Sequence, residues 1–207
     1  MRSICWLNRF RSNGFRLIPF ALSIIFFSNL LSVVGCSSRR SVEPAPELIG
    51  QSLPSFRGES LDGLIVQFPE EVRGRSHLLL VAYVQEAQFD VDRWVLGVLQ
   101  AKAPVNVLEL PTISSLGARL AKGFINRGMK QGIPREDWAS VVTVYGDADV
   151  LRSYVGEIPG NNACALLVDS KGIVRWVHRD GYSPRELLEL VSVAQDLGSE
   201  TSEHGKK

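Results

Sequence analysis

The hydrophobic pattern divides the chain into an N-terminal apolar stretch and a longer region of short alternating runs. Residues 17–35 carry no charge, whereas residues 1–16 contain four arginines and no acidic residue. A basic segment followed by an apolar one is typical of a secretory signal peptide. From about residue 50 onward, continuous apolar runs alternate with amphipathic segments, which predicts a folded α/β domain.

The apolar runs of this region predict its strands. Residues 78–84 (LLLVAYV) are apolar throughout, as in a strand that is buried on both faces. The sequence Ser170-Lys171-Gly172 separates two further runs and is typical of a tight β-hairpin turn. The expected strands are residues 64–68, 78–84, 105–110, 141–145, 163–169 and 173–178.

Helices are expected between the strands, where apolar residues recur every three or four positions. The last helix has the clearest start, with Ser183 as N-cap, Pro184 in its first turn and Glu186 completing a capping box. The expected helices are residues 89–99, 115–127, 149–155 and 184–197. Because helices between strands imply parallel crossovers, this order predicts a three-layer α/β fold, a mixed central sheet with helices on both faces.

Polar segments bound the predicted domain on both sides. Residues 36–49 contain charges and prolines and are interpreted as a flexible tether. Residues 198–207 are interpreted as a disordered tail. The folded domain is therefore expected over residues 50–197, the size of a single domain, and residues 1–35 are the predicted signal peptide.

Composition limits what this domain can bind. The 23 basic residues less the four arginines of the signal leave 19, against 22 acidic residues, a formal net charge of −3 that argues against nucleic acid as a partner. His77, His178 and His204 are far apart in sequence, and no cluster of Cys and His has metal-ligand spacing. We therefore expect neither a metal nor another cofactor.

Cys36 directly follows Val33-Val34-Gly35 at the end of the apolar stretch. A cysteine after small residues at this point resembles the lipobox of bacterial lipoproteins, in which the thiol receives diacylglycerol and becomes the mature N-terminus. The resemblance implies an extracytoplasmic domain that acyl chains attach to a membrane. The alternative is an uncleaved transmembrane anchor, because the 19 uncharged residues of a helix would extend about 28 Å.

The region from residue 50 to 197 resembles the thioredoxin superfamily. The resemblance rests on residues 50–56 (GQSLPSF) and 61–63 (LDG) near its start, and on residues 166–176 (LLVDSKGIVRW) near its end. Such motifs indicate a fold and carry little information about activity.

Redox members of that superfamily place a Cys-x-x-Cys motif or a peroxidatic cysteine just after the first buried strand, where a helix N-terminus stabilises the thiolate. Here residues 85–90 (QEAQFD) contain no cysteine, and their polar members are interpreted as residues that begin a helix. The family also places a cis-proline before the strand that faces the active site, and here Asn162 and Ala163 stand at that point. The resemblance therefore implies the non-redox branch, with a degenerate active-site region formed by Glu86, Gln88, Asp90, Asn162 and Cys164.

Cys164 is the one cysteine inside the predicted domain, because Cys5 lies in the signal and Cys36 at the lipidation site. A single cysteine within the apolar run ACALLV is expected to be a small core residue. The alternative is a divergent thiol peroxidase or reductase, which would need a partner protein to supply a second thiol.

A narrower resemblance covers residues 126–190. Residues 127–134 (RGMKQGIP), 145–147 (YGD), Asn162 and residues 168–176 occur in the same order as in the mitochondrial ATPase complex subunit ten family. That family consists of thioredoxin-like, membrane-associated assembly factors for the proton channel of F-type ATP synthase. The resemblance implies a chaperone or assembly role toward a membrane-associated protein.

A basic stretch lies within the same region. It is either a solvated surface or an arm that docks an acidic partner or anionic lipid headgroups. The candidate partner-binding residues are Arg119, Lys122, Arg127, Met129, Lys130 and Arg135.

These features predict a lipid-anchored, extracytoplasmic thioredoxin-like protein that binds or helps to assemble a membrane-associated client. A thiol enzyme that uses Cys164 and a small-molecule-binding module are the alternatives.

Overall fold

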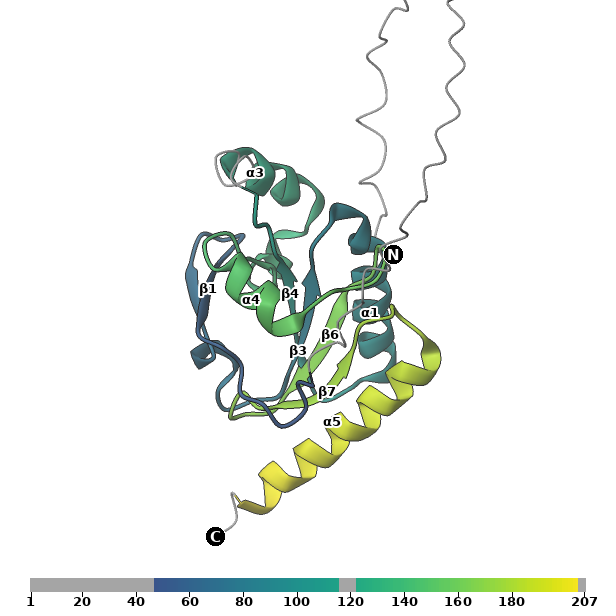
Figure 1. Cartoon of the computed structure of the whole chain (residues 1–207). Helices are drawn as coiled ribbons and strands as arrows, with labels where there is room; N and C mark the ends of the chain where they lie inside the picture. The colour runs from purple at the N-terminus through teal and green to yellow at the C-terminus, as the bar shows by residue number, and fades with distance from the viewer. Residues whose placement is uncertain (1–46, 116–121, 205–207) are drawn as a thin grey trace, which may run out of the picture. The chain divides into compact units, whose positions relative to one another are not determined.

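The computed structural model describes residues 47–115 and 122–204 (Figure 1). The predicted signal peptide, Cys36, most of the tether and Arg119 lie outside the described residues, and what was inferred for them stays a prediction. Within the described part of the chain, no helix is both long enough and apolar enough to cross a bilayer.

The described strands form a three-stranded and a four-stranded sheet. The first has the order β2 (Ile65–Phe68), β1 (Phe56–Ser60) and β5 (Val142–Thr143), and the second the order β4 (Asn106–Pro111), β3 (His77–Ala82), β6 (Cys164–Val168) and β7 (Val174–His178). Parallel bridges from Glu109 to Val141 and from Thr112 to Val144 link the two sheets. Because β3 pairs in parallel with β4 and antiparallel with β6, the sheet is mixed, as predicted.

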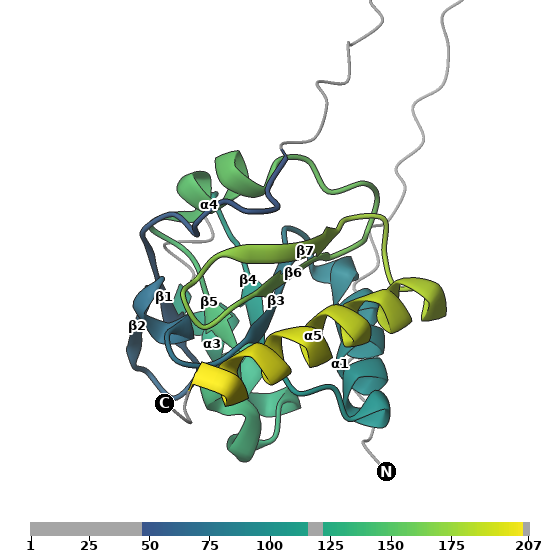
Figure 2. The same cartoon turned by 90° about the horizontal axis from the view of Figure 1, so that it is seen from below.

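Helices cover both faces of the four-stranded sheet (Figures 1 and 2). α1 (Gln88–Ala101) and α5 (Pro184–His204) pack on one face, where Trp94 and Leu190 belong to the same buried cluster as Leu80 of β3. α4 (Ala148–Val155) packs on the other face, where Leu151 lies in a second cluster with Val81. These layers confirm the predicted three-layer α/β fold.

The central strands β3 and β6 contribute to both clusters because successive side chains of a strand point to opposite faces. This double burial explains why both runs are apolar throughout. The residues on the α4 face are Leu79, Val81, Cys164 and Leu166. The residues on the face of α1 and α5 are Leu78, Leu80, Ala165 and Leu167.

Three details differ from the sequence prediction. β1 was not predicted, because its sequence FRGES has a central glycine and only one large apolar residue. Leu99 is exposed, although its spacing placed it on the apolar stripe of α1. α5 continues to His204, because nothing in residues 198–204 interrupts the helix where a disordered tail was expected.

The remaining elements are short or peripheral. η1 (Glu70–Val72), η2 (Gln85–Ala87) and η3 (Arg135–Ser140) are 3-10 turns. α3 (Lys122–Gly132) extends beyond residue 127, where the predicted helix ended, and none of its residues is buried.

The β6–β7 hairpin marks the end of the sheet at which the N-terminal segment joins the domain. The amide of Gly50 donates to the carbonyl of Val174 (2.8 Å), and the amide of Leu53 donates to that of Gly172 (2.9 Å). Gly172 has a φ of +80°, which a tight turn requires of it. The start of α1 lies at the opposite end of the sheet, because it follows the last residue of β3.

The Asp169 side chain stabilises this hairpin. Its carboxylate accepts the amides of Lys171 (2.8 Å) and Ile173 (3.0 Å) and the Nε of Arg175 (2.8 Å). Burial alone would raise the pKa of Asp169, but these hydrogen bonds and the Arg175 charge outweigh burial and hold the pKa below its ordinary value.

Candidate functional site

The C-terminal end of β3 is the position at which a redox member of the superfamily would carry its cysteines. The chain leaves β3 at Ala82, forms the turn η2 and begins α1 at Gln88, without a cysteine in residues 83–90. Glu86 and Gln88 are exposed, and the Gln88 amide donates to the Asp92 carboxylate at 3.0 Å. Both residues fit the predicted role of beginning the helix.

Asp90 lies in the first turn of α1, as predicted, and has a further structural role. Its side chain is only 1% exposed. One carboxylate oxygen accepts the amide of Tyr182 (2.7 Å) and contacts the Arg93 guanidinium (3.2 Å), and the other accepts the amide of Ala163 (3.0 Å). Asp90 therefore ties the start of α1 to the two chain segments that face it, at the point where the family places its cis-proline.

Asn162 completes this packing. Gly181, with a φ of +87°, lies so close to Asn162 that a Cβ there would approach the Asn162 Oδ1 to 2.7 Å. The Gly181 carbonyl is in turn 2.9 Å from the Nε2 of His178. The segment before β6 is thus fixed against the segment after β7.

Aromatic side chains fill the space beneath Asp90. The Trp94 ring, fully buried, meets Tyr182 edge-on at 5.2 Å between centroids and Trp176 at 5.8 Å. Such edge-to-face pairs add to the stability that burial provides. Trp94 and Trp176 both belong to the buried cluster beneath α1 and α5.

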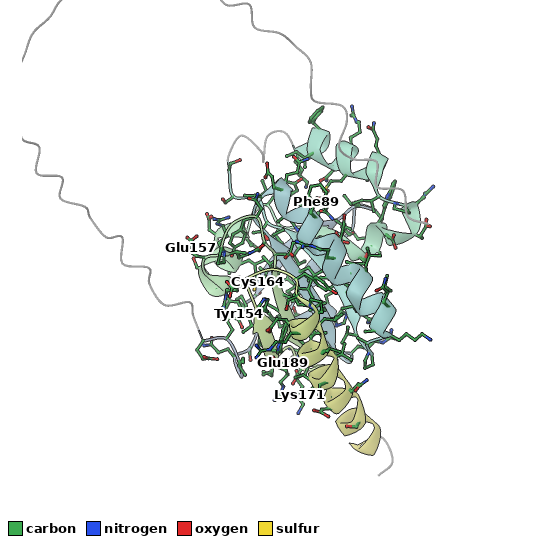
Figure 3. The ribbon with its side chains drawn as sticks, turned by 90° about the vertical axis from the view of Figure 1, so that its right-hand side faces the viewer. Phe89, Tyr154, Glu157, Cys164, Lys171 and Glu189 are labelled. Carbon is green, nitrogen blue, oxygen red and sulfur yellow. The ribbon has the colours of Figure 1, made fainter. Side chains whose placement is uncertain are left out.

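Val84 and Phe89 are the residues of this end that sequence reasoning missed. Val84 is 44% and Phe89 53% exposed, and Figure 3 shows Phe89 toward one end of the molecule and Lys171 toward the other. The exposure of Phe89 could have been predicted from the sequence. Phe89 lies two residues before the buried Val91 and so points about 200° away from it on the helix.

Cys164 is buried in the core of the domain. Alternation along β6 directs it into the cluster beneath α4, whereas its neighbours Ala163 and Ala165 belong to the cluster beneath α1. It is 0% exposed. Burial raises the pKa of the Cys164 thiol to about 12, although the charge of Arg179 acts in the opposite direction. A thiol in this state is a poor nucleophile at neutral pH.

Tyr83 follows β3 and packs against the buried cluster that contains Cys164. Its hydroxyl donates to the carbonyl of Gly156 at 2.9 Å, and the Arg152 guanidinium lies 3.9 Å from its ring centroid. Burial raises the pKa of Tyr83 well above its ordinary value, so the phenol stays protonated and keeps donating.

The candidate basic residues fall into two groups. Lys122 forms an ion pair with Glu59 of β1, over the ring of Tyr145, and so attaches α3 to the sheet. Lys130 and Arg135 lie on the surface, 4.9 Å and 5.7 Å from the Trp138 ring centroid.

Arg127 and Met129 are the two remaining candidates in the described part of the chain. Arg127 is exposed, and Met129 is half-buried. The structure therefore brings Arg127, Lys130 and Arg135 to one surface and gives Lys122 a structural task.

Two shallow cavities lie away from Asp90. One of about 420 Å³ lies near Arg75, Pro104 and Asn106, at the end of the sheet opposite the start of α1. The other, about 190 Å³, lies between Glu59, Lys122 and Tyr145. No group of His, Cys, Asp and Glu among the described residues could hold a metal ion.

Comparison with known proteins agrees with this architecture. No protein-family model and no curated protein matches the chain. A candidate protein disulfide isomerase from Bacteroides thetaiotaomicron has a similar structure at 18% identity, over 78% of this chain and 96% of that one, with a TM-score of 0.52.

Two further solved structures are similar. One is a candidate thiol:disulfide interchange protein DsbE from Chlorobium tepidum (15% identity, 72% and 96% of the chains, TM-score 0.49). The other is the exposed lipoprotein thioredoxin Etrx1 from Streptococcus pneumoniae (11% identity, 67% and 98% of the chains, TM-score 0.48). At such identities the likeness concerns the fold alone, and the described domain is a thioredoxin-like domain.

Proposed function

We propose that the chain is a lipid-anchored, extracytoplasmic thioredoxin-like protein without thiol chemistry, which binds or helps to assemble a membrane-associated protein. The observation that carries this proposal is Asp90. At the position where a redox member needs an accessible thiolate, this chain has a buried carboxylate that accepts two backbone amides. A group committed to holding chain segments together is suited to a scaffold rather than to a catalyst.

The arrangement of the two ends of the sheet supports a binding role. The N-terminal segment joins the domain beside the β6–β7 hairpin, through Gly50 and Leu53. Val84 and Phe89 lie at the other end, where α1 begins. A domain that is anchored through its N-terminal segment would therefore present these apolar side chains away from the point of attachment.

The test uses the full chain in its own membrane, with a photo-crosslinking amino acid in place of Gln85, an exposed residue beside Phe89. We expect an adduct with one membrane protein that Phe89→Ser abolishes. The control Leu188→Ser removes an apolar residue of α5 that is even more exposed than Phe89, and it should leave the adduct unchanged. An adduct that survives Phe89→Ser would show that this end is not the binding surface.

The lipid anchor is tested separately. Metabolic labelling with a fatty acid should mark the chain, and Cys36→Ala should remove the label and release the protein from the membrane fraction. Retention of Cys36→Ala in the membrane would favour the uncleaved anchor instead.

The thiol-enzyme alternative makes the opposite prediction for Cys164. If Cys164 acted on a partner, Cys164→Ala or added reductant would abolish the adduct. The burial of this thiol and its raised pKa support an adduct that both treatments leave intact.

A further inference from the structure

The segment from Lys122 to Arg135 concentrates positive charge in a chain that is otherwise balanced. It contains four basic residues and no acidic residue, while the whole chain has 23 basic and 22 acidic residues. Glu59 neutralises Lys122. The outward charge of the segment is therefore that of Arg127, Lys130 and Arg135.

Polar contacts fix which side of α3 faces the sheet. Lys122 and Asn126 both contact the carboxylate of Glu59, and the Tyr145 hydroxyl donates to the Asn126 Oδ1 at 2.8 Å. Phe124 lies midway between Lys122 and Asn126 in sequence, about 200° around the helix from each. Its side chain therefore points outward, and it is 68% exposed.

The charges at the end of the segment are held in place. The Lys130 ammonium and the Arg135 guanidinium both lie over Trp138, whose Nε1 donates to the carbonyl of Ile133 at 3.0 Å. Cation–π contacts of this kind order long side chains before a partner arrives, so less conformational entropy is lost on binding.

We propose that this surface, which we call the α3 face (Phe124, Arg127, Lys130 and Arg135), docks an acidic segment of the partner protein that also carries an apolar side chain for Phe124. The inference rests on the proposed function and names the chemistry of the partner. Complementary charge steers such an encounter and fixes its orientation. An exposed phenylalanine among fixed positive charges provides the apolar contact.

α3 lies at the end of the sheet where α1 begins (Figures 1 and 3), whereas Gly50 joins the domain at the hairpin end. Within the described domain, the α3 face therefore lies at the opposite end of the sheet from Gly50.

The test uses the full chain in zwitterionic nanodiscs and a fluorescent helical peptide of glutamate, leucine and phenylalanine, with a lysine-for-glutamate version as its control. We expect the acidic peptide to bind and the basic one not to. Arg127→Glu with Lys130→Glu should weaken binding about tenfold or more, and added salt should weaken it further. The matched double reversal Arg73→Glu with Lys171→Glu, on exposed residues near the hairpin, should leave the affinity unchanged.

Three results would overturn the inference: equal binding of both peptides, equal weakening by both double reversals, or binding of anionic vesicles through the α3 face in place of the peptide. Phe124→Ser separates the apolar contribution, and it should weaken binding without changing the salt dependence. If the peptide fails to bind while the adduct from position 85 persists, this inference fails and the proposed function stands.

Discussion

The start of α1 and the helix α3 lie at the same end of the sheet but are held in different ways. The start of α1 is fixed by the buried Asp90, by the contact of Asn162 with Gly181 and by the aromatic packing around Trp94. α3 has no buried residue and is attached by the contacts of Lys122 and Asn126 with Glu59.

The two elements differ in how firmly the fold holds them. In a redox member, the start of the helix must leave a thiolate accessible, whereas here Asp90 is buried in the first turn of α1 and accepts two backbone amides. The exposed charges and apolar side chains lie beside it, on a helix whose surface can change at little cost in stability. The four predictions below test this contrast.

Asp90→Ala should have the largest effect on stability. It leaves the amides of Ala163 and Tyr182 buried without an acceptor, and each such group costs about 1–3 kcal/mol. We expect the free energy of unfolding to fall by about 3 kcal/mol in urea titrations. Asp92→Ala, on the exposed side of the same helix, should change it by less than about 0.5 kcal/mol. A similar small change for Asp90→Ala would mean that the helix start is no more firmly held than α3.

Gly181→Ala should destabilise the same region, because Gly181 lies in the segment after β7 that packs against Asn162. Alanine at a φ of +87° is strained, and its Cβ would displace the Asn162 side chain, so we expect a loss of about 2 kcal/mol. Gly123→Ala is the matched change in α3, where a Cβ meets nothing within 4 Å and alanine favours a helix, so stability should rise slightly. Thermal unfolding of both variants measures the contrast directly.

Asp169→Asn should lower the free energy of unfolding by weakening the hairpin end of the sheet, away from α1 and α3. Because the folded-state pKa of Asp169 lies below its ordinary value, its contribution is complete above about pH 4 and is lost as the pH falls through the folded pKa. We expect a loss of about 1.5 kcal/mol at pH 7. In urea titrations at decreasing pH, the wild-type protein should approach the variant. Parallel pH profiles would contradict this role.

Thr143→Val should have the smallest effect, and it should be stabilising. The Thr143 hydroxyl is buried and has no hydrogen-bond partner among the described residues, so its removal should raise the free energy of unfolding by about 1 kcal/mol. Thr112→Val is the control, because that hydroxyl donates to the carbonyl of Leu110 at 3.0 Å and its loss should destabilise by about the same amount. A destabilised Thr143→Val would indicate that the hydroxyl has a partner in solution.

The sequence predicted the layers of the fold because they depend on local periodicity. The run around Leu80 and the capping residues Ser183 and Glu186 are local signals, and the Glu186 amide does donate to the Ser183 Oγ at 3.2 Å. The role of Asp90 could not be predicted in the same way, because the backbone amides that donate to it lie 73 and 92 residues further along the chain. The pairing of Lys122 with Glu59 is equally non-local. The sequence alone therefore could not distinguish Lys122, which attaches α3 to the sheet, from the exposed basic residues of the same segment.

The alternation along β6 has a practical consequence for anyone who studies this domain. Because the Cys164 side chain points beneath α4 and is buried there, maleimide dyes and thiol-reactive spin labels should not react with it in the folded state. A cysteine introduced at Phe89 or Phe124 would then be the reactive thiol of the described domain. Distances from a label at Phe89 or Phe124 could thus be followed by spectroscopy without first replacing Cys164.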